Sequence, residues 1–364
     1  MTMPKRVLHF QGRMGKGGAE TFMMNAYRSI DRLEYQFDFV IYEDFKDVTP
    51  YHEEIKKLGG NIYITANPNK NIIKYIKDVK KILSENDFDI VHNEIFFGGG
   101  INLWLANKAG IKKRIAHSHA TSDGKGNKFP YGLVRTFLNK LLKKNATDFL
   151  ACSHEAGVGL FGDNEDFIVI PNGIDLKKYN SVNKTKEELK ERLVIPSNAF
   201  VIGHIGRFED QKNHRFLLQI FEYILIKHPN TYLLSVGTGN LEEEIKMLSE
   251  QNGIDSHTLF LGERNDIDLL MNTMDVFLLP SLYEGLPIVA IEAQAAGVKL
   301  VLSDEVSRDT ILSENVEFVG LQDPLESWER AVMEGDTRNE PLPKLFEFDM
   351  EKSTQLLTTV YKGK

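Results

Sequence analysis

Hydrophobic and polar positions follow one pattern that occurs twice along the chain. Short runs rich in β-branched and aromatic residues alternate with longer amphipathic stretches, as expected of βα units built around parallel sheets. The first series of strand-like runs is VLHF (7–10), FDFVIY (37–42), NIYIT (61–65), DIVHNE (89–94), KRIAHSHA (113–120) and DFLACS (148–153). The second series is FVIGHIGR, TYLLSVG, TLFLGE, DVFLLPS and KLVLSD. The pattern predicts two consecutive doubly wound α/β domains.

The junction between the two series is polar. VIPNGIDLKKYN (169–180) is followed by a stretch rich in Lys and Glu (183–192). Since single cores stop growing at roughly 250–300 residues, a chain of 364 residues also favours two domains. We expect an N-terminal domain at 1–170, a C-terminal domain at 171–345, and a final helix at 346–364 that can pack back on the first domain. Ligands of doubly wound sheets bind at the carboxyl ends of the strands, so a cleft between the two domains is expected.

Composition narrows the class of protein. With 42% hydrophobic and 26% charged residues the chain is typical of a globular protein. One cysteine, Cys152, excludes an internal disulfide and fits a reducing compartment. No apolar run approaches the ~18 residues of a membrane helix, and the N-terminal run is too short for a signal peptide. We therefore expect a cytoplasmic protein, and the sequence pI of about 5.8 argues against nucleic-acid binding.

The stretch SLYEGLPIVAIEAQAAG (281–297) gives the clearest indication of a binding site in the sequence. It follows the buried run DVFLLP (275–280), and Pro287 suits the first position of a helix that Gly297 would end. A helix N-terminus presents unpaired N–H groups and partial positive charge, which favour phosphate.

Glu284 and Glu292 flank this predicted helix start. Carboxylates bind the hydroxyls of sugars and ribose well, while the amides between them could hold a diphosphate. Glu284 as a solvated turn residue and Glu292 as a surface charge is the simpler interpretation, but Glu292 lies among apolar neighbours. We predict a nucleotide-sugar ligand, with donor contacts from Glu292 and from Gly285, Leu286, Pro287 and Ile288.

A second loop carries two cations. In GHIGRFEDQKNH (203–214), Arg207 and Lys212 follow a strand-like run and a glycine. Two cations at the carboxyl end of a strand suit the neutralisation of a diphosphate leaving group, although surface cations on a polar turn would look the same.

These motifs together resemble a known family. E-G-L-P-x-x-x-x-E followed by A-x-A-x-G is similar to the signature of retaining glycosyltransferases of family GT4 with the GT-B fold. The order of motifs over nearly the whole chain most resembles bacterial exopolysaccharide glycosyltransferases of the EpsF type. The resemblance implies two Rossmann-like domains facing each other across a cleft. It also implies that Arg207 and Lys212 hold the donor phosphates, Glu284 the sugar and Glu292 the ribose, without a metal ion or other cofactor.

The resemblance assigns further residues in the first half. In QGRMGKGGAET (11–21), Lys16 precedes Gly17, which does not match a P-loop. The resemblance instead places Gly17 and Gly18 near the phosphate and sugar of the donor. In RIAHSHATS (114–122), strand alternation puts His117 and His119 on one face. A buried, hydrogen-bonded histidine is the commoner interpretation of either, but the resemblance aligns His119 with a sugar-contacting histidine and leaves His117 structural.

Other loops are weaker signals. PNGID (171–175) and FLGERND (260–266) have turn composition, and in relatives such loops frame the nucleotide, which suggests Asn172 and Arg264 as donor contacts. Asp87-Phe88-Asp89 imitates an Asp-x-Asp metal motif but lies between a helix and a strand, where turn chemistry explains it. We expect no required metal.

The segment YGLVRTFLNKLLKK (131–144) has apolar positions at helical spacing and a basic remainder. A solvated basic face and contact with anionic lipid headgroups are about equally compatible with this pattern. Because relatives act on lipid-linked acceptors, we consider a peripheral contact with the inner face of the cell membrane. The basic residues are Arg135, Lys140, Lys143 and Lys144.

The resulting hypothesis is an enzyme. It would transfer a sugar from a nucleotide-sugar, most simply UDP-linked, to a hydroxyl of a lipid-linked saccharide in exopolysaccharide or capsule biosynthesis, with retention of configuration. A non-catalytic GT-B subunit and a UDP-sugar epimerase are the alternatives. A phosphorylase would need a pyridoxal phosphate lysine in another context, and a Rossmann dehydrogenase would need G-x-G-x-x-G where this chain has GRMGKGGAE.

Overall fold

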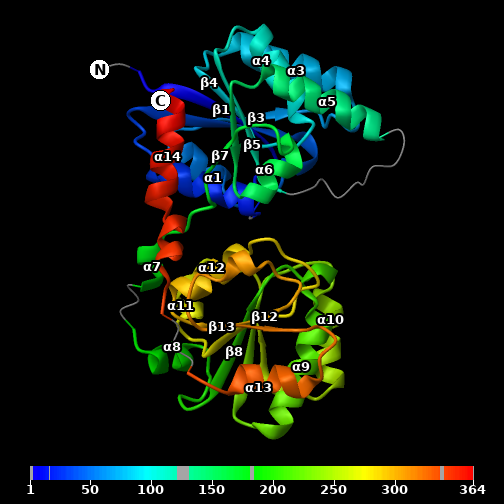
Figure 1. Ribbon diagram of the computed structural model, residues 1–364, viewed down its shortest axis with the longest axis vertical. Coiled ribbons are helices and arrows are strands. Elements are labelled where there is room, and N and C mark those ends of the chain that lie inside the picture. The colour runs from blue at the N-terminus through cyan, green and yellow to red at the C-terminus, as the bar shows by residue number, and fades with distance from the viewer. Residues whose placement is uncertain (1–2, 16, 121–130, 181–183, 337–339, 364) are drawn as a thin grey trace. The chain divides into compact units, whose positions relative to one another are not determined.

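The chain folds into two compact units, shown in the computed structural model of Figure 1. One unit is Met1–Gly173 with Met350–Lys364, and the other is Ile174–Asp349. Among the described residues, no helix is long and apolar enough to cross a membrane. The residues that the structure describes are 3–15, 17–120, 131–180, 184–336 and 340–363.

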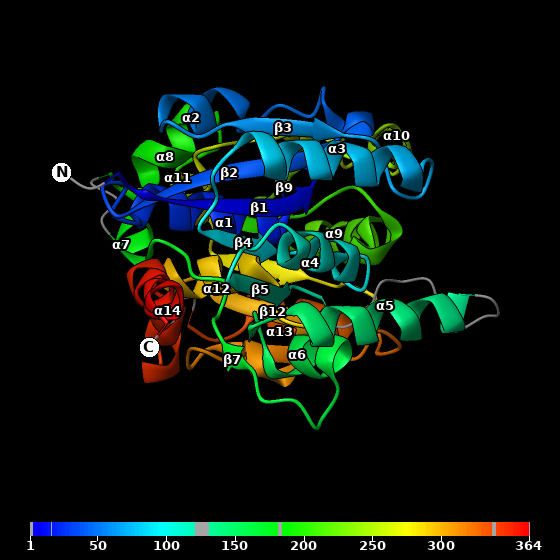
Figure 2. The same cartoon turned by 90° about the horizontal axis from the view of Figure 1, so that it is seen from above.

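The first unit is built on a sheet in which all paired strands are parallel, in the order β3-β2-β1-β4-β5-β6-β7. Figure 2 shows these strands side by side from β3 to β5. Their buried runs are rich in Val, Ile and Phe, as parallel strands covered on both faces require. The strands are β1 (Lys5–Gly12), β2 (Tyr35–Tyr42), β3 (Ile62–Thr65), β4 (Ile90–Asn93), β5 (Lys113–Ser118), β6 (Asp148–Ala151) and β7 (Ile168–Val169).

Helices cover both faces of this sheet. α1 (Gly18–Ser29), α2 (His52–Lys57) and α14 (Met350–Lys362) pack on one hydrophobic core, to which α14 contributes Leu357, Val360 and Tyr361. The other face is covered by α3 (Ile72–Glu85), α4 (Gly99–Lys108), α5 (Tyr131–Asn145) and α6 (His154–Phe161). The last helix of the chain therefore belongs to the first unit.

The second unit repeats the plan with a parallel sheet in the order β10-β9-β8-β11-β12-β13. Its strands are β8 (Phe200–Ile205), β9 (Thr231–Val236), β10 (Thr258–Phe260), β11 (Val276–Leu279), β12 (Lys299–Ser303) and β13 (Val316–Val319). Its helices are α7 (Leu176–Asn180), α8 (Lys186–Arg192), α9 (His214–Lys227), α10 (Glu242–Gln251), α11 (Ile267–Met271), α12 (Ile288–Ala295) and α13 (Leu325–Met333). Short 3₁₀ turns lie at Glu43–Phe45, Asp210–Lys212, Asp255–His257, Arg308–Thr310 and Pro343–Phe348.

The strand orders place a topological switch point in each sheet. In the first, the direction of winding changes between β1 and β4, and in the second between β8 and β11. The loops that follow these strands diverge to opposite faces and leave a crevice in which doubly wound sheets bind ligands. The loops after β8 and β11 are those that the sequence singled out.

Some details differ from the sequence predictions. The short strands β7 and β13 were not predicted, because one has two residues and both are partly exposed. Pro287 is the N-cap of α12 and not its first helical residue: its carbonyl accepts the Ala290 N–H, while its own ψ of 121° is extended. Gly297 ends the helix as expected, with φ 70°. Cys152 lies just after β6 and is half-buried.

Candidate functional site

The carboxyl edge of the second sheet brings Lys212 and Glu284 together. Lys212 ends the loop after β8, and Glu284 lies in the loop between β11 and α12. The Lys212 ammonium donates to Glu284 Oε1 at 2.5 Å, and the two side chains are only 15% and 11% exposed. Ser281 Oγ lies 3.4 Å from the same oxygen. The pair is charge-assisted and partly shielded from water, which holds both groups in fixed positions.

Glycines let the neighbouring loops approach closely. A Cβ on Gly206 would lie 3.0 Å from the side-chain carbons of Lys212. The absence of a side chain at Gly206 therefore leaves room for the Lys212 side chain to reach Glu284. Gly237, at φ 136°, packs on the Gly206 carbonyl, where a Cβ would come within 2.0 Å. These contacts fix the loop that carries Lys212.

The Glu284 loop is held by backbone pairing. The Glu284 N–H donates to the Glu305 carbonyl at 3.3 Å, and the Ser307 N–H donates to the Glu284 carbonyl at 3.0 Å. The loop then leads to α12, whose first turn presents N–H groups without helical acceptors, as every helix does. Around Gly285 a Cβ would find no atom within 4 Å, so this side of the loop is open. Leu286 and Ile288 are half-buried beside it.

Glu292 lies about one turn into α12 and is half-buried. It accepts a hydrogen bond from the Tyr179 hydroxyl at 2.7 Å. Burial raises the pKa of Glu292 to about 7, and the Tyr179 hydrogen bond opposes that shift. This carboxyl group therefore changes charge near neutral pH, which its interpretation as a solvated surface charge does not explain.

The two predicted arginines have other partners. Arg207 is 66% exposed and pairs with Glu209 at 3.2 Å. Arg264 makes a two-pronged contact with Asp266, at 2.9 and 2.7 Å, on the loop after β10. Neither contact joins these arginines to the Lys212–Glu284 pair, so their predicted roles in donor binding stay predictions.

In the first unit the glycine-rich loop leads into α1. Gly17 is the N-cap and Gly18 the first residue of the helix, as expected. A Cβ on Gly17 would lie 2.3 Å from the carboxylate of Glu20, at the end of a flexible side chain that would have to move. Lys16, which argued against a P-loop, lies outside the described residues.

His119 follows β5 and lies close to Asn172. Its ring packs on His117, with centroids 4.1 Å apart, and on Phe22. Burial lowers the pKa of His119 to about 4, and the Asn172 side chain opposes the shift. Both His119 ring nitrogens and Asn172 Oδ1 are buried without a hydrogen-bond partner among the described residues. Two residues predicted from separate motifs are thus brought together. The Thr-Ser that follows them in the motif lies outside the described part of the chain.

Comparison with known proteins identifies the chain. The family model of glycosyl transferases group 1 matches residues 185–329, and that of glycosyltransferase family 4 matches residues 16–178. A Bacillus subtilis protein named "Putative glycosyltransferase EpsF" is 34% identical over 371 residues, which cover 98% of this chain and 96% of the relative. The chain belongs to the group 1 glycosyltransferases.

Two further proteins resemble this glycosyltransferase. UDP-Gal:alpha-D-GlcNAc-diphosphoundecaprenol alpha-1,3-galactosyltransferase of Escherichia coli is 31% identical over 248 residues, 64% of this chain and 63% of the relative. The crystal structure of Anabaena HepE in complex with UDP has a TM-score of 0.75 and 18% identity, and all of each chain is covered. The predicted GT-B fold of this glycosyltransferase is confirmed.

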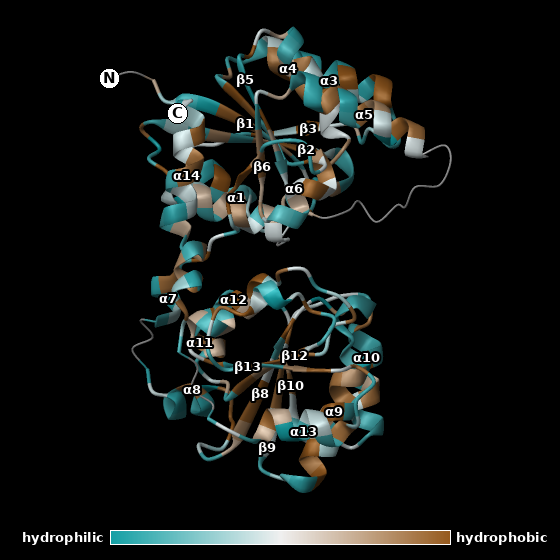
Figure 3. Cartoon of the chain, viewed as in Figure 1, coloured by the Kyte–Doolittle hydropathy of each residue, from teal (hydrophilic) through white to brown (hydrophobic). Residues whose placement is uncertain are grey.

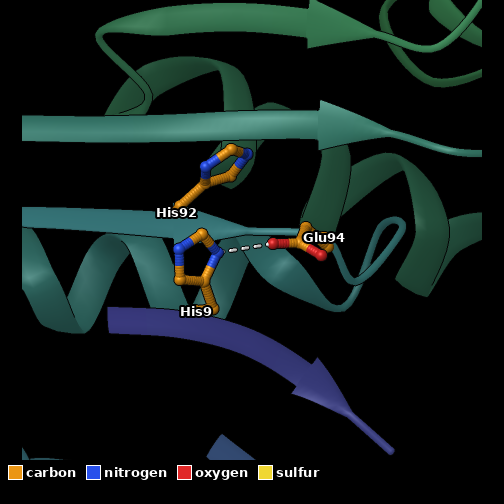
Figure 4. A group of neighbouring side chains, drawn as sticks. All are labelled: His9, His92 and Glu94. Carbon is orange, nitrogen blue, oxygen red and sulfur yellow. Dashed lines mark hydrogen bonds and ion pairs between the residues drawn. The ribbon is translucent and has the colours of Figure 1, made fainter. Parts of the chain in front are cut away.

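Sequence reasoning missed a polar cluster inside this glycosyltransferase. Among the described residues, one group of potential metal ligands has its ligand atoms within 4.8 Å of one another: His9, His92 and Glu94 (Figure 4). His9 Nδ1 already contacts Glu94 Oε1 at 2.7 Å. The sequence signal available was strand alternation, which puts His9 and His92 on inward positions of apolar runs. The expectation that no metal is required stays a prediction.

Proposed function

We propose that this glycosyltransferase transfers a sugar from UDP to a hydroxyl of a lipid-linked saccharide, with retention of configuration, in exopolysaccharide or capsule biosynthesis. The observation that carries the proposal is the shielded Lys212–Glu284 pair beside the start of α12. A fixed cation and free helical N–H groups suit a diphosphate, and a fixed carboxylate suits sugar hydroxyls.

The reaction breaks the bond between the anomeric carbon and the diphosphate oxygen and forms one to the acceptor oxygen. Negative charge develops on the departing diphosphate, where Lys212 and the first-turn amides of α12 would stabilise it. In a retaining transfer the acceptor hydroxyl approaches on the side of the leaving group. The departing phosphate oxygen can therefore take the hydroxyl proton, and no protein nucleophile is needed.

The remaining residues would position the donor. Glu284 would accept hydrogen bonds from sugar hydroxyls and Glu292 from the ribose, with His119 at the sugar. Gly17 and Gly18 would let the backbone approach the donor, while Asn172, Arg207 and Arg264 would contribute polar contacts. The UDP in the HepE structure and in the name of the E. coli relative supports a uridine donor.

The acceptor half of the proposal rests on the E. coli relative and on α5. The name of that relative specifies an undecaprenol-linked acceptor. On α5, Leu133, Val134 and Phe137 are exposed, and so are Lys140 and Lys144. Figure 3 shows hydrophobic and hydrophilic residues interspersed along this helix. Exposed apolar residues beside lysines suit an anionic lipid surface. The other basic residues have protein partners: Lys143 pairs with Glu165, and Arg135 lies over the Phe97 ring. We place the enzyme at the inner face of the cell membrane.

The test uses purified full-length protein, a panel of nucleotide-sugars and vesicles that carry an undecaprenyl-diphosphate saccharide, all with EDTA. Wild type is expected to hydrolyse one UDP-sugar slowly and to transfer its sugar to the vesicles. Glu284→Ala should lose both activities, whereas Glu250→Ala, an exposed glutamate of α10, should keep them. Binding of UDP without hydrolysis or transfer would favour the non-catalytic subunit, and conversion of the UDP-sugar to its epimer would favour the epimerase. Activity only with added metal would overturn the expectation of metal independence.

A further inference from the structure

Three histidines from adjacent strands form a buried row on the face of the first sheet that α1 and α14 cover. His9 of β1 is paired in register with His92 of β4. His92 in turn pairs with Ile115 of β5, and His117 lies two residues further along on the same face. All three side chains are fully buried. Histidines rarely gather in a core without a purpose that offsets the cost of burying polar groups.

Hydrogen bonds connect this histidine row to the end of the chain. His92 Nδ1 lies 2.8 Å from the Tyr361 hydroxyl of α14, and His92 Nε2 lies 3.0 Å from His117 Nδ1. Burial lowers the pKa of His92 and His117 well below the usual value and raises that of Tyr361 well above it. All three groups are therefore neutral at physiological pH.

Because these groups are neutral, the hydrogen bonds that join Tyr361, His92 and His117 can run in only two donor-to-acceptor orders. Each neutral imidazole has one donor and one acceptor nitrogen. If the Tyr361 hydroxyl donates to His92 Nδ1, then His92 Nε2–H donates to His117 Nδ1, and the proton of His117 is fixed on Nε2. In the opposite direction His117 donates to His92, and His92 donates to the Tyr361 oxygen. Each direction leaves one buried donor, His117 Nε2–H or the Tyr361 hydroxyl, without a partner among the described residues. In both, the tautomers of His92 and His117 are coupled to Tyr361.

The ring of His119 packs against the ring of His117. The two rings are in contact at 4.1 Å, and Phe22 of α1 lies 5.8 Å from each. The Asn172 side chain also interacts with His119 and opposes the lowering of the His119 pKa. The orientation of His119 therefore depends on Asn172 and on packing against the His117 ring, which His92 holds in turn.

We propose that Tyr361 is a positioning residue, which acts through His92 and His117 to fix the orientation of His119. The terminal helix α14 would then be part of the sugar-contacting apparatus and not only a cover for the sheet. This inference rests on the proposed function, which gives His119 its contact with the transferred sugar.

A metal ion at His9, His92 and Glu94 is the competing interpretation of the same cluster. His92 uses both ring nitrogens in hydrogen bonds, and His9 Nδ1 faces Glu94. A metal ligand must offer a free lone pair, so these contacts favour the hydrogen-bonded row.

The first experiment follows the tautomers directly in the full chain. Two-dimensional ¹H–¹⁵N spectra of the imidazole rings distinguish protonated from unprotonated nitrogens, with assignments from single His→Gln variants. Wild type should show a single tautomer at each of His92 and His117, and Tyr361→Phe should give a mixture of tautomers at both. Tyr35→Phe is the matched control, since it removes a buried hydroxyl from the same core outside the row. An unchanged spectrum in Tyr361→Phe, or a shift of His9 and His92 on addition of one equivalent of Zn²⁺, would overturn the proposal.

The second experiment tests whether the row acts through His119. Tyr361→Phe should lower kcat for donor hydrolysis by roughly tenfold or more, as small displacements at a reacting centre do. It should leave the Kd for UDP unchanged and have no further effect in a His119→Ala background. An equal loss in both backgrounds would overturn the proposal, because it would show a general effect on the fold. If His119→Ala itself is fully active while the tautomers shift as expected, the assigned role of His119 is wrong and the row remains.

Discussion

The two sheets hold polar groups at their carboxyl ends in opposite ways. In the second unit, Lys212 and Glu284 form an ion pair that is largely shielded from water, and burial raises the pKa of Glu292 to about 7. In the first unit, His9, His92, His117 and Tyr361 are buried, neutral and joined in part by hydrogen bonds. The same doubly wound plan therefore supplies charge on one side and uncharged, oriented hydrogen-bonding groups on the other.

Under the proposed function, the difference has a chemical reason. A diphosphate carries its charge into the reaction and leaves with more of it, so the groups that meet it need opposite charge. A sugar hydroxyl is neutral, and recognition of it needs donors and acceptors in fixed directions. Experiments on the charged groups of the second unit and on the neutral groups of the first unit can test this comparison.

The largest effect is expected for Lys212→Ala. Loss of this cation removes charge stabilisation from the departing diphosphate, and removal of one such group typically lowers kcat by about 10²–10³. Donor hydrolysis and UDP binding by calorimetry are the measurements, at low and high salt. Arg215→Ala is the control, since Arg215 pairs with Glu244 and Asp210 on the exposed side of α9. Near-normal donor hydrolysis by Lys212→Ala would show that the charge of Lys212 does not stabilise the departing diphosphate.

How much of this contrast the sequence predicted differs between the units. Buried parallel strands produce long apolar runs, and the E-G-L-P motif is local, so the fold, Glu284 and Lys212 could all be predicted. The link from the histidine row to Tyr361 could not, because Tyr361 is 269 residues from His92 and only the return of α14 to the first unit brings them together. The partners of Arg207 and Arg264 depend on loop geometry, which residue spacing does not encode.

The next largest effect is expected in how the free energy of unfolding depends on pH. Burial raises the pKa of Glu292 to about 7, above its value of about 4.3 in an unfolded chain. Between these values the folded protein binds more protons than the unfolded one, so the free energy of unfolding falls as pH rises from about 4.3 to 7. Glu292→Gln should lack this fall, which amounts to at most about 4 kcal/mol. Urea unfolding of both proteins at several pH values measures it, and parallel curves would contradict the raised pKa.

UDP binding gives a second readout of the same group. Ribose hydroxyls donate to an ionised carboxylate, so the affinity of wild type for UDP should rise through pH 7 more steeply than that of Glu292→Gln. Ionisation of the diphosphate itself, near pH 6, is common to both proteins and cancels in the comparison. His119→Asn should keep the wild-type profile, because the pKa of His119 is about 4. A different result would contradict the comparison. If His119→Asn and not Glu292→Gln flattens the dependence of UDP affinity on pH, the titrating group lies in the first unit and not in the second.

The smallest effect is expected for Gly285→Ala, and it asks whether the diphosphate approaches the start of α12 at all. The added methyl group would meet no atom within 4 Å, so the midpoint of urea unfolding should stay close to that of wild type. A diphosphate seated on this loop would meet the methyl group, and the affinity for UDP should fall by a factor of a few. Gly98→Ala is the matched control in the first unit, where the new Cβ lies 3.4 Å from Ile95 in ordinary contact. Equal UDP affinity in the two variants would move the diphosphate away from Gly285 and leave Lys212 as the principal phosphate contact of the second unit.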